Sequence, residues 1–438
     1  MLTALPAVND GDTAWVLTCA ALVLFMVPGL ALFYAGMVRS RNALTMMQQN
    51  IIAIGVVTVL WALIGYSLAY SHNAAGFIGD LGNFGLAHLG GTPASALHLV
   101  GPGVAIPAMA FVAYQMMFAI ITPALISGAT AARLKAAGWA VFVAIWSVVV
   151  YAPVVHWLWG PSGWLATLGA QDWAGGIVVH TSAGAAVVAM LLVVGRRTNW
   201  PDGGTLPHSV PLTIAGAGIL LFGWFGFNAG DGLQANGIAA QAFINTLLAA
   251  AAGMLLWLIM EHRGHGHATV LGAVTGAVAG LATITPCAGY VSAYSALLIG
   301  AIAGLVCHIA LRMKRFFKLD DALDVIAVHF VGGALGSLLV GFFAEKSINP
   351  VSANGVFYGG GGKLLGDQVT AVVCVAAFSF ALTWIIATGI QKTIGLRVAP
   401  GNEARLDQVQ QGMDAYHFEH VWNLPGSAAA PGPARARS

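Results

Sequence analysis

Long apolar stretches recur along this chain of 438 residues, and they constrain its fold more than any other feature. Each is about 20 residues long, the length that a helix needs to cross the hydrocarbon core of a bilayer. A helix also satisfies its own backbone hydrogen bonds in lipid. The sequence therefore predicts an all-α, polytopic membrane protein with eleven transmembrane helices. They cover approximately residues 14–37, 48–71, 104–128, 139–158, 173–194, 210–229, 239–260, 269–285, 292–311, 323–343 and 367–391.

The composition excludes several other classes of protein. Hydrophobic residues make up 58% of the chain and charged residues 8%, against about 25% charged residues in soluble domains. The net charge of +2 provides no basic field for phosphates, so nucleic acid is not an expected partner. The four cysteines lie far apart inside apolar stretches and form no C-x-x-C pair. We expect neither a metal site nor a cofactor.

The basic residues predict the orientation of the helices. Sixteen of the eighteen Lys and Arg residues fall on one face, and only Lys346 and Lys363 fall on the other. By the positive-inside rule the basic face is cytoplasmic. We therefore expect the N-terminus outside and the C-terminus inside a cell (cytoplasmic) membrane. Residues 1–12 contain no Lys or Arg, so the first stretch is expected to be a retained helix and not a signal peptide.

Two domains and an internal repeat are expected. Residues 1–393 form the transmembrane domain, and residues 394–438 form a polar cytoplasmic tail. Five spans followed by five spans predict an inverted 5+5 repeat over about 13–195 and 208–343, with the span at about 367–391 as an extra helix. His180 and His329, each followed by small residues, occupy matching positions in the fifth span of each half.

An ionisable side chain within a transmembrane span indicates a specific structural or functional role, because placing it in the bilayer costs roughly 2.5–3.5 kcal/mol. His180 and His329 are read either as neutral core histidines or as a pair that presents hydrogen-bonding edges to a narrow lumen. Asp172 and Asp324 are read as helix N-caps or as functional carboxylates near the two mouths. Asp231 is read as a solvated loop acid or as part of a cation site.

Aromatic residues gather toward the outer side of several spans. They form an interfacial belt or a cage that holds a small cation against ring faces. Tyr114 and Phe118 are one helical turn apart, and Trp224 and Phe227 are spaced similarly. Trp157 and Trp159 follow the fourth span.

Six motifs in order give a specific resemblance. They are Pro28–Gly36, Gly65–Tyr70, Asp172–His180, Gly223–Asn228, Thr285–Tyr290 and Asp324–His329. At these residues the chain resembles the ammonium transporter (Amt/Mep/Rh) family, on the Amt side, over about residues 13–416. The resemblance implies a homotrimer with one pore per subunit. It also implies ammonium and ammonia as substrates, with methylammonium as an analogue, and a PII-type signal protein as a partner at the cytoplasmic face.

The resemblance also implies roles for individual residues. Trp159 and Tyr114, where the family usually has Phe, would form the outer cation site, and Phe118 and Phe227 the gate below it. His180 and His329 would be the twin-histidine pair, with Trp224 and Thr285 lining the pore nearby. Asp172 matches the essential buried carboxylate of the family, and Ser67 would begin a proton route.

Two positions depart from the family pattern. Asp231 replaces a Ser whose hydroxyl helps to bind the cation, which predicts stronger cation attraction and poorer selectivity for ammonium. Arg405 stands where Gly is usual, which makes coupling of subunits through the tail less secure.

The expected mechanism is that ammonium binds at the outer aromatic site, loses its proton near the gate, and crosses as ammonia. The proton either stays behind or follows by a separate route, which would make transport electrogenic. An ammonium sensor that signals through the tail is the main alternative. A membrane haem protein and an Rh-like channel are weaker ones. The histidines at 262, 265 and 267 are read as a solvated loop, with a metal site as the less favoured alternative.

Overall fold

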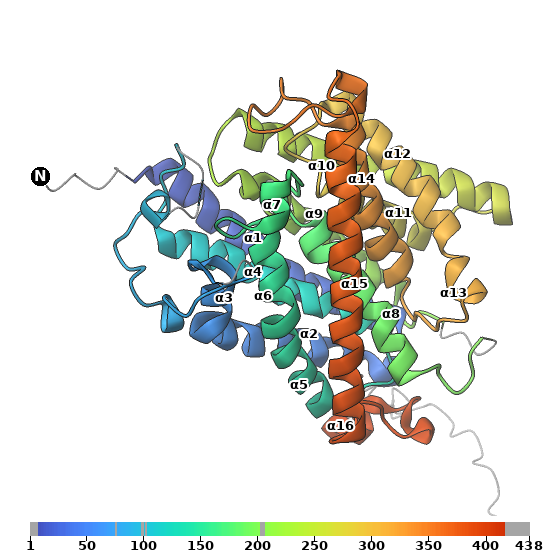
Figure 1. Ribbon diagram of the computed structural model, residues 1–438. Helices are drawn as coiled ribbons and strands as arrows, with labels where there is room; N and C mark the ends of the chain where they lie inside the picture. Colours follow the sequence, from blue (N-terminus) through green and yellow to red (C-terminus); the bar gives the residue numbers. More distant parts are fainter. Residues whose placement is uncertain (1–7, 75–76, 98–99, 101–102, 202–205, 417–438) are drawn as a thin grey trace, which may run out of the picture.

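The computed structural model describes residues 8–74, 77–97, 100, 103–201 and 206–416. Sixteen α-helices occur in this part of the chain, and most of them run side by side in one bundle (Figure 1). The first eight are α1 (Asp10–Met37), α2 (Ala43–Leu60), α3 (Tyr66–Tyr70), α4 (Ala108–Ala129), α5 (Ala136–Trp146), α6 (Ala152–Leu158), α7 (Trp164–Leu168) and α8 (Ser182–Val194). The others are α9 (Val210–Ala229), α10 (Gly237–His265), α11 (Val270–Ile284), α12 (Ala293–Ala310), α13 (Met313–Phe316), α14 (Gly332–Phe343), α15 (Lys363–Lys392) and α16 (Leu406–Gln411).

Ten helical segments in the described residues are long and apolar enough to cross a membrane, some of them built from two consecutive helices. Each overlaps one of the eleven expected spans, which confirms the all-α, multi-pass membrane architecture. The expected span at 269–285 is the shorter apolar helix α11, so its crossing of the bilayer stays a prediction. The inverted repeat, the division at residue 393 and the orientation also stay predictions.

Four short π-helical segments interrupt the regular helices of the described chain. They are Trp61–Gly65, Ser147–Tyr151, Gly176–Thr181 and Ile326–Val331. A π turn adds one residue to a helical turn and is frequent at functional sites. The last two segments contain His180 and His329, each directly before a helix of the bundle, α8 and α14.

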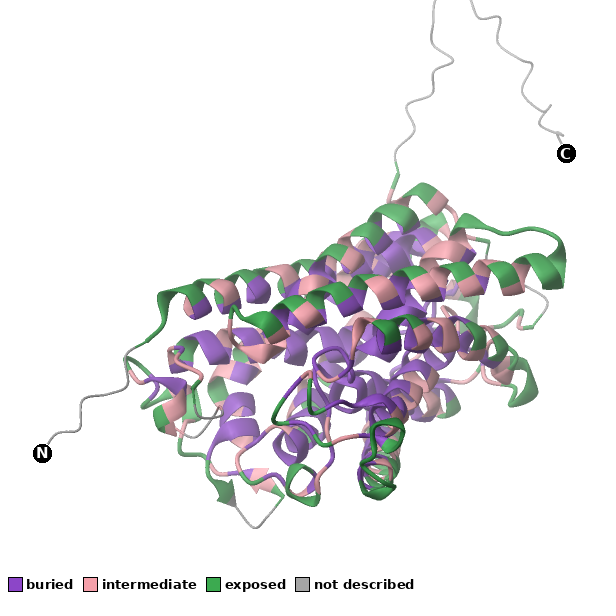
Figure 2. Cartoon of the chain, turned by 90° about the horizontal axis from the view of Figure 1, so that it is seen from above, coloured by how far each residue is buried: buried purple, intermediate pink, exposed green. Residues whose placement is uncertain are grey.

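The outer surface of the bundle carries the apolar side chains that lipid requires. Buried residues occupy the middle of the bundle and exposed residues its periphery (Figure 2). The exposed residues on the spans include Phe25, Ile51, Leu255 and Ile385. Helix α15 lies across the outside of the bundle (Figure 1) and packs on α8 and α14. Exposed apolar side chains over such a large area fit immersion in a bilayer.

The longest connection between spans, residues 72–103, contains a two-stranded antiparallel sheet. Strand β1 (Asn73–Ala74) pairs with β2 (Ile78–Gly79), with Asn73 opposite Gly79. This loop lies at the end of α3, and Trp157 at the end of α6 donates a hydrogen bond to the carbonyl of Phe77. The loop is thereby fixed over the end of the bundle that holds the aromatic residues.

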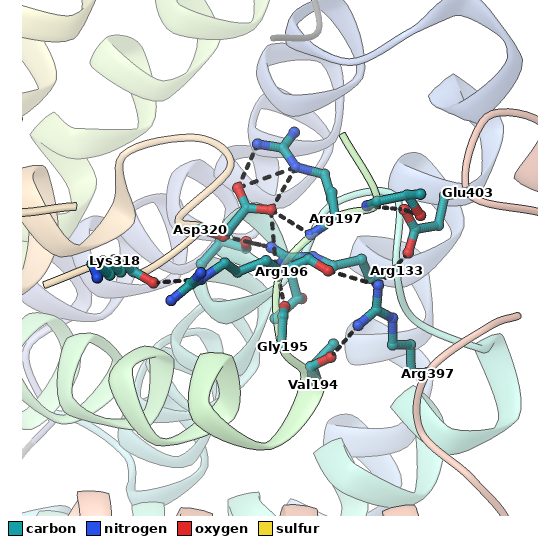
Figure 3. A network of polar contacts seen from close by, with 12 residues as sticks. Arg133, Val194, Gly195, Arg196, Arg197, Lys318, Asp320, Arg397 and Glu403 are labelled. Carbon is teal, nitrogen blue, oxygen red and sulfur yellow. Dashed lines mark hydrogen bonds and ion pairs between the residues drawn. The ribbon is translucent and has the colours of Figure 1, made fainter. Parts of the chain in front are cut away.

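A buried ionic network lies at the opposite end of the bundle, where the tail begins (Figure 3). The fully buried Arg133 donates to the carbonyls of Gly195, Asp320 and Ala129 and lies 3.5 Å from the Asp320 carboxylate. Asp320 also accepts from the backbone N–H and the guanidinium of Arg197. The network joins the connections that follow α4, α8 and α13.

The tail packs onto this network. Arg397 forms an ion pair with Glu403 at 2.5 Å, and Glu403 also accepts from Thr198. One turn later the buried Asp407 accepts from the backbone N–H groups of Leu44 and Thr45. Arg405 has φ −149°, a conformation that any residue adopts, so Arg in place of Gly causes no backbone strain here.

We expect Asp320→Asn to lower the stability of the folded protein by about 3 kcal/mol, because it leaves the buried Arg133 without a counter-charge. Burial raises the pKa of Asp320, but the hydrogen bonds of Arg197 and the charge of Arg133 lower it further, so its net pKa lies below the ordinary 3.8. The ionic stabilisation is therefore present above pH 3.8 and is lost as the pH falls through the lowered pKa.

Thermal denaturation of the detergent-solubilised protein measures this effect. Asp80→Asn is the matched control, because Asp80 lies in the loop 72–103, away from the network, and 43% of its side chain is exposed. Equal melting temperatures for Asp320→Asn and the control would contradict the role given to the network.

Candidate functional site

Two histidines from different halves of the chain meet in the centre of the bundle. The Nδ1 atoms of His180 and His329 lie 3.2 Å apart, and both side chains are buried. In such a contact one Nδ1 donates and the other accepts. The two Nε2 atoms are then one acceptor and one donor, and the Nε2 of His180 has no partner among the described residues. The pair can therefore both give and receive a hydrogen bond.

Small residues after each histidine make this contact possible. A Cβ atom at Gly333 would collide with His180, and one at Gly184 would collide with Phe330, the residue after His329. The predicted close approach of the two helices is thus a property of their glycines.

The histidines line a narrow cavity of about 40 Å³. Phe227, Trp224, Leu323 and Asp324 are among the residues that line it. Most of the remaining wall is apolar. It consists of Met26, Leu30, Phe33, Tyr34, Met37, Ile121, Leu125, Val179, Leu220, Thr275, Val278 and Val328. A water molecule needs about 10–15 Å³ by this kind of measure, so the cavity has room for only a few small molecules.

Two phenylalanine rings, tilted by 32° to each other, lie between the histidines and the aromatic residues Tyr114 and Trp159. The ring centroids of Phe118 and Phe227 are 4.3 Å apart, and Phe227 lies 6.2 Å from the ring of His180. Trp224 stacks on His180 at 5.6 Å and donates a hydrogen bond of 2.9 Å to the hydroxyl of Thr285. The structure thus brings together the predicted gate and pore residues.

The outer aromatic side chains are held by their polar atoms. The hydroxyl of Tyr114 donates to the carbonyls of Gly226 and Phe227 at the end of α9. The indole N–H of Trp159 donates to the carbonyl of Asp172 at 2.9 Å. Both rings pack against Phe118, at 5.0 Å for Tyr114 and 5.7 Å for Trp159. The polar atoms are therefore used for positioning.

Asp172 organises the start of the segment that carries His180. Its two carboxylate oxygens accept hydrogen bonds from four consecutive backbone N–H groups, those of Gly175, Gly176, Ile177 and Val178. The capping interpretation of Asp172 is thus confirmed. Because the same segment contains His180, Asp172 also fixes the position of that imidazole.

Sequence reasoning missed the corresponding carboxylate in the second half. Asp321 accepts from the backbone N–H of Ile326 at the start of the segment that carries His329. Asp321 precedes its histidine by eight residues, as Asp172 precedes His180, and this shared spacing could have revealed it. Burial and the nearby charge of Asp324 raise the pKa of Asp321 to about 6.

The expectation that Asp324 caps this span is wrong. Its carboxylate forms an ion pair of 2.5 Å with Lys314, and its backbone is left-handed, with φ 61°. Asp324 instead is one of the residues that line the histidine cavity.

Ser67 and Asp231 differ in how they relate to the cavity. Ser67 donates to the carbonyl of Asp80, and its hydroxyl lies 3.0 Å from that of Ser71, so its described contacts are with Ser71 and with the loop 72–103. Asp231 follows Gly230, which packs against the ring of Tyr114. Its Oδ1 is buried and has no described hydrogen-bond partner, so a fully solvated loop acid does not describe it.

The three histidines at the end of α10 are exposed. In the described part of the chain, no three His, Cys, Asp or Glu side chains form a group that could hold a metal ion.

Comparisons with known proteins agree on one family. A model described as "Ammonium Transporter Family" matches residues 14–416. An ammonium transporter of Mycobacterium bovis is 44% identical, covering 94% of this chain and 91% of the relative. Amt1 of Archaeoglobus fulgidus is 40% identical, covering 94% and 99%.

Solved structures give the same result. Mep2 of Candida albicans is 35% identical with a TM-score of 0.84, covering 90% of this chain and 87% of that one. A structure titled "Sensor Amt Protein" is 30% identical with a TM-score of 0.82, covering 92% and 98%. Because the match to the family model spans nearly all the described residues, this chain belongs to the ammonium transporter family.

Proposed function

We propose that the protein is an ammonium transporter of the cell membrane that conducts ammonia through the histidine cavity. The observation that carries the proposal is the contact of 3.2 Å between His180 and His329 inside a narrow apolar cavity. Such a cavity disfavours a bare cation, because an ion pays a large desolvation cost at low dielectric. It can pass a small neutral molecule that forms hydrogen bonds.

The outer aromatic residues are proposed to collect ammonium. Ring faces attract a cation by about 0.5–2 kcal/mol each, which replaces part of its hydration. Trp159 and Tyr114 flank Phe118 at the outer side of the gate, and Asp231 adds a carboxylate close to Tyr114. The site therefore combines ring faces with a negative charge.

Deprotonation is proposed to occur near Phe118 and Phe227. Potassium resembles ammonium in size and charge but has no proton to lose, so this step discriminates between them. Ammonia then crosses by hydrogen bonding to His180 and His329, and the proton moves separately, with Asp172 and Ser67 as the residues expected on its route. Trp224 and Thr285 hold the wall beside the histidines.

The assembly and partners are part of the same proposal. The chain forms a homotrimer with its N-terminus outside and residues 394–438 inside. Methylammonium is a transported analogue, and a PII-type protein binds the cytoplasmic face. The family is one of transporters, and no enzymatic activity is proposed.

Asp231→Ser is expected to weaken the apparent affinity for ammonium by about tenfold, because it removes a charge from a partly desolvated cation site. It should also improve discrimination against potassium. Uptake kinetics with and without competing potassium measure both effects. Asp10→Ser, an exposed acid at the start of α1, is the control. Unchanged affinity and potassium competition in Asp231→Ser would contradict the role given to this carboxylate.

Flux into proteoliposomes tests the function itself. Purified wild-type protein should give ammonium-dependent flux well above that of empty vesicles. A sensor that binds ammonium without transporting it, the alternative suggested by the "Sensor Amt Protein" relative, would give none.

A further inference from the structure

We infer that Gln368 of helix α15 is a positioning residue for Trp159 in the outer cation site. It acts through Gln171 and Asp172, which connect the two side chains. This role rests on the proposed function, in which Trp159 collects ammonium. Gln368 belongs to none of the six sequence motifs.

The side-chain amide of Gln368 is fully buried and forms three hydrogen bonds. Its carbonyl oxygen accepts from the backbone N–H of Gln171 at 2.7 Å, and its amino group donates to the carbonyl of Gln171 at 2.7 Å. The amino group also donates to the carbonyl of Ser337 on α14 at 2.7 Å. A buried amide is costly unless its hydrogen bonds are made, so these contacts account for a glutamine at this position of an apolar helix.

The backbone of Gln171 depends on this side chain. Gln171 lies in the irregular stretch between α7 and the π-helical segment Gly176–Thr181. A backbone outside helices and strands has no regular partners for its N–H and C=O groups. Among the hydrogen bonds of the described residues, Gln368 supplies the partner of both groups of Gln171. The glutamine therefore fixes this stretch of backbone relative to α15.

The first turn of α15 holds the preceding residues as well. Lys363 donates to the carbonyl of Leu168 at 3.0 Å and forms an ion pair of 2.6 Å with Asp367. Gly169 has φ 119°, and a Cβ atom there would lie 2.6 Å from the carboxylate of Asp367. Helix α7 accordingly lies beside α15 (Figure 1). The whole stretch 168–171 is thus packed against the start of α15.

The outer cation site begins one residue later. The carbonyl of Asp172 accepts the indole N–H of Trp159 at 2.9 Å, so the position of this carbonyl sets the direction of the ring. The carboxylate of Asp172 is held separately, by four backbone N–H groups of the segment that carries His180. Releasing Gln171 therefore disturbs Trp159 more than it disturbs the histidine.

Ammonium uptake into proteoliposomes, analysed as a KM and a maximal rate, tests this role. Gln368→Leu removes all three hydrogen bonds and leaves an apolar side chain in their place. Its KM should rise about tenfold, because a ring that is no longer held in place contributes little cation–π attraction. Its maximal rate should fall by less than about threefold, because the segment of His180 keeps its cap.

Thr383→Val is the matched control. Thr383 lies on the same helix, is also fully buried, and accepts from the indole N–H of Trp146 on α5. This variant should keep the wild-type KM. A double-mutant cycle with Trp159→Leu separates positioning from a general loss of structure. In the Trp159→Leu background Gln368→Leu should leave the KM unchanged, because the ring through which it acts is gone.

Gln368→Met, which has the length of glutamine and no amide, repeats the test with a second side chain. An unshifted KM in both variants, or the same rise in KM with and without Trp159, would overturn the positioning role. Failure of both variants to fold would also overturn it, because Gln368 would then act on stability alone. Absence of flux in the wild-type protein would instead contradict the proposed function.

Discussion

Alanine at His180 or at His329 is expected to lower ammonium flux by about tenfold or more in reconstituted vesicles. Each substitution removes one partner of the contact of 3.2 Å and leaves the other imidazole without it in an apolar cavity. The substrate then loses one hydrogen bond at the position in the cavity where its free energy is highest. Such a loss lowers the transport rate roughly tenfold. The vacated volume also admits water, so the ratio of ammonium to potassium current should fall.

A third histidine variant controls for the substitution itself. His262→Ala changes an exposed residue at the end of α10 and should transport as wild type does. Wild-type flux and selectivity in both His180→Ala and His329→Ala would rule out the histidine pair as the conducting element.

Asp172→Ala is expected to abolish transport. The substitution leaves four buried backbone N–H groups without an acceptor, each at a cost of about 1–3 kcal/mol, at the start of the segment that holds His180. Asp172→Asn keeps one acceptor oxygen, so it should retain part of the stability and of the flux. Flux per molecule of folded protein, with the melting temperature measured in parallel, separates the two effects.

Asp12→Ala is the matched control for Asp172→Ala. Asp12 is also buried, but it lies outside the histidine cavity, and its carboxylate accepts from the backbone N–H of Ala235. It should lose some stability and keep its flux. If Asp172→Ala is folded and transports as well as Asp12→Ala does, the role of Asp172 in positioning His180 is wrong.

Much of the fold could be predicted because lipid imposes simple rules on a chain. A helix that crosses the bilayer needs a long apolar stretch, and these stretches are visible in the sequence. Helix α11 shows where the rule weakens. It packs against both α10 and α12 and has only 15 residues, so its length alone does not identify it as a span.

The candidate site was predicted from its motifs, and the contacts of His180, His329, Phe118 and Phe227 agree with that prediction. The π-helical segments could not be foreseen, because no simple residue pattern specifies them. The segment Trp61–Gly65 directly precedes α3, whose second residue is Ser67. One extra residue turns the following helix face by roughly 100°, so the direction in which a side chain of α3 points cannot be worked out from regular helical spacing.

Asp321 and Asp324 illustrate a different limit. Both carboxylates stand near the start of the span of His329, and a capping rule based on position alone chose the nearer one. Asp324 has a left-handed backbone, and its carboxylate forms an ion pair with Lys314, so it does not cap the helix. Only the spacing of eight residues, repeated in both halves, distinguished Asp321.

The most direct test of the central claim is a comparison of ammonium and potassium currents from wild-type protein on a solid-supported membrane. The claim is that cations do not enter the histidine cavity, and that ammonia crosses it after ammonium has lost its proton. It predicts a current, or an equivalent flux of ammonia, with ammonium and none with potassium, even at much higher potassium concentration. Potassium currents as large as those of ammonium would contradict it.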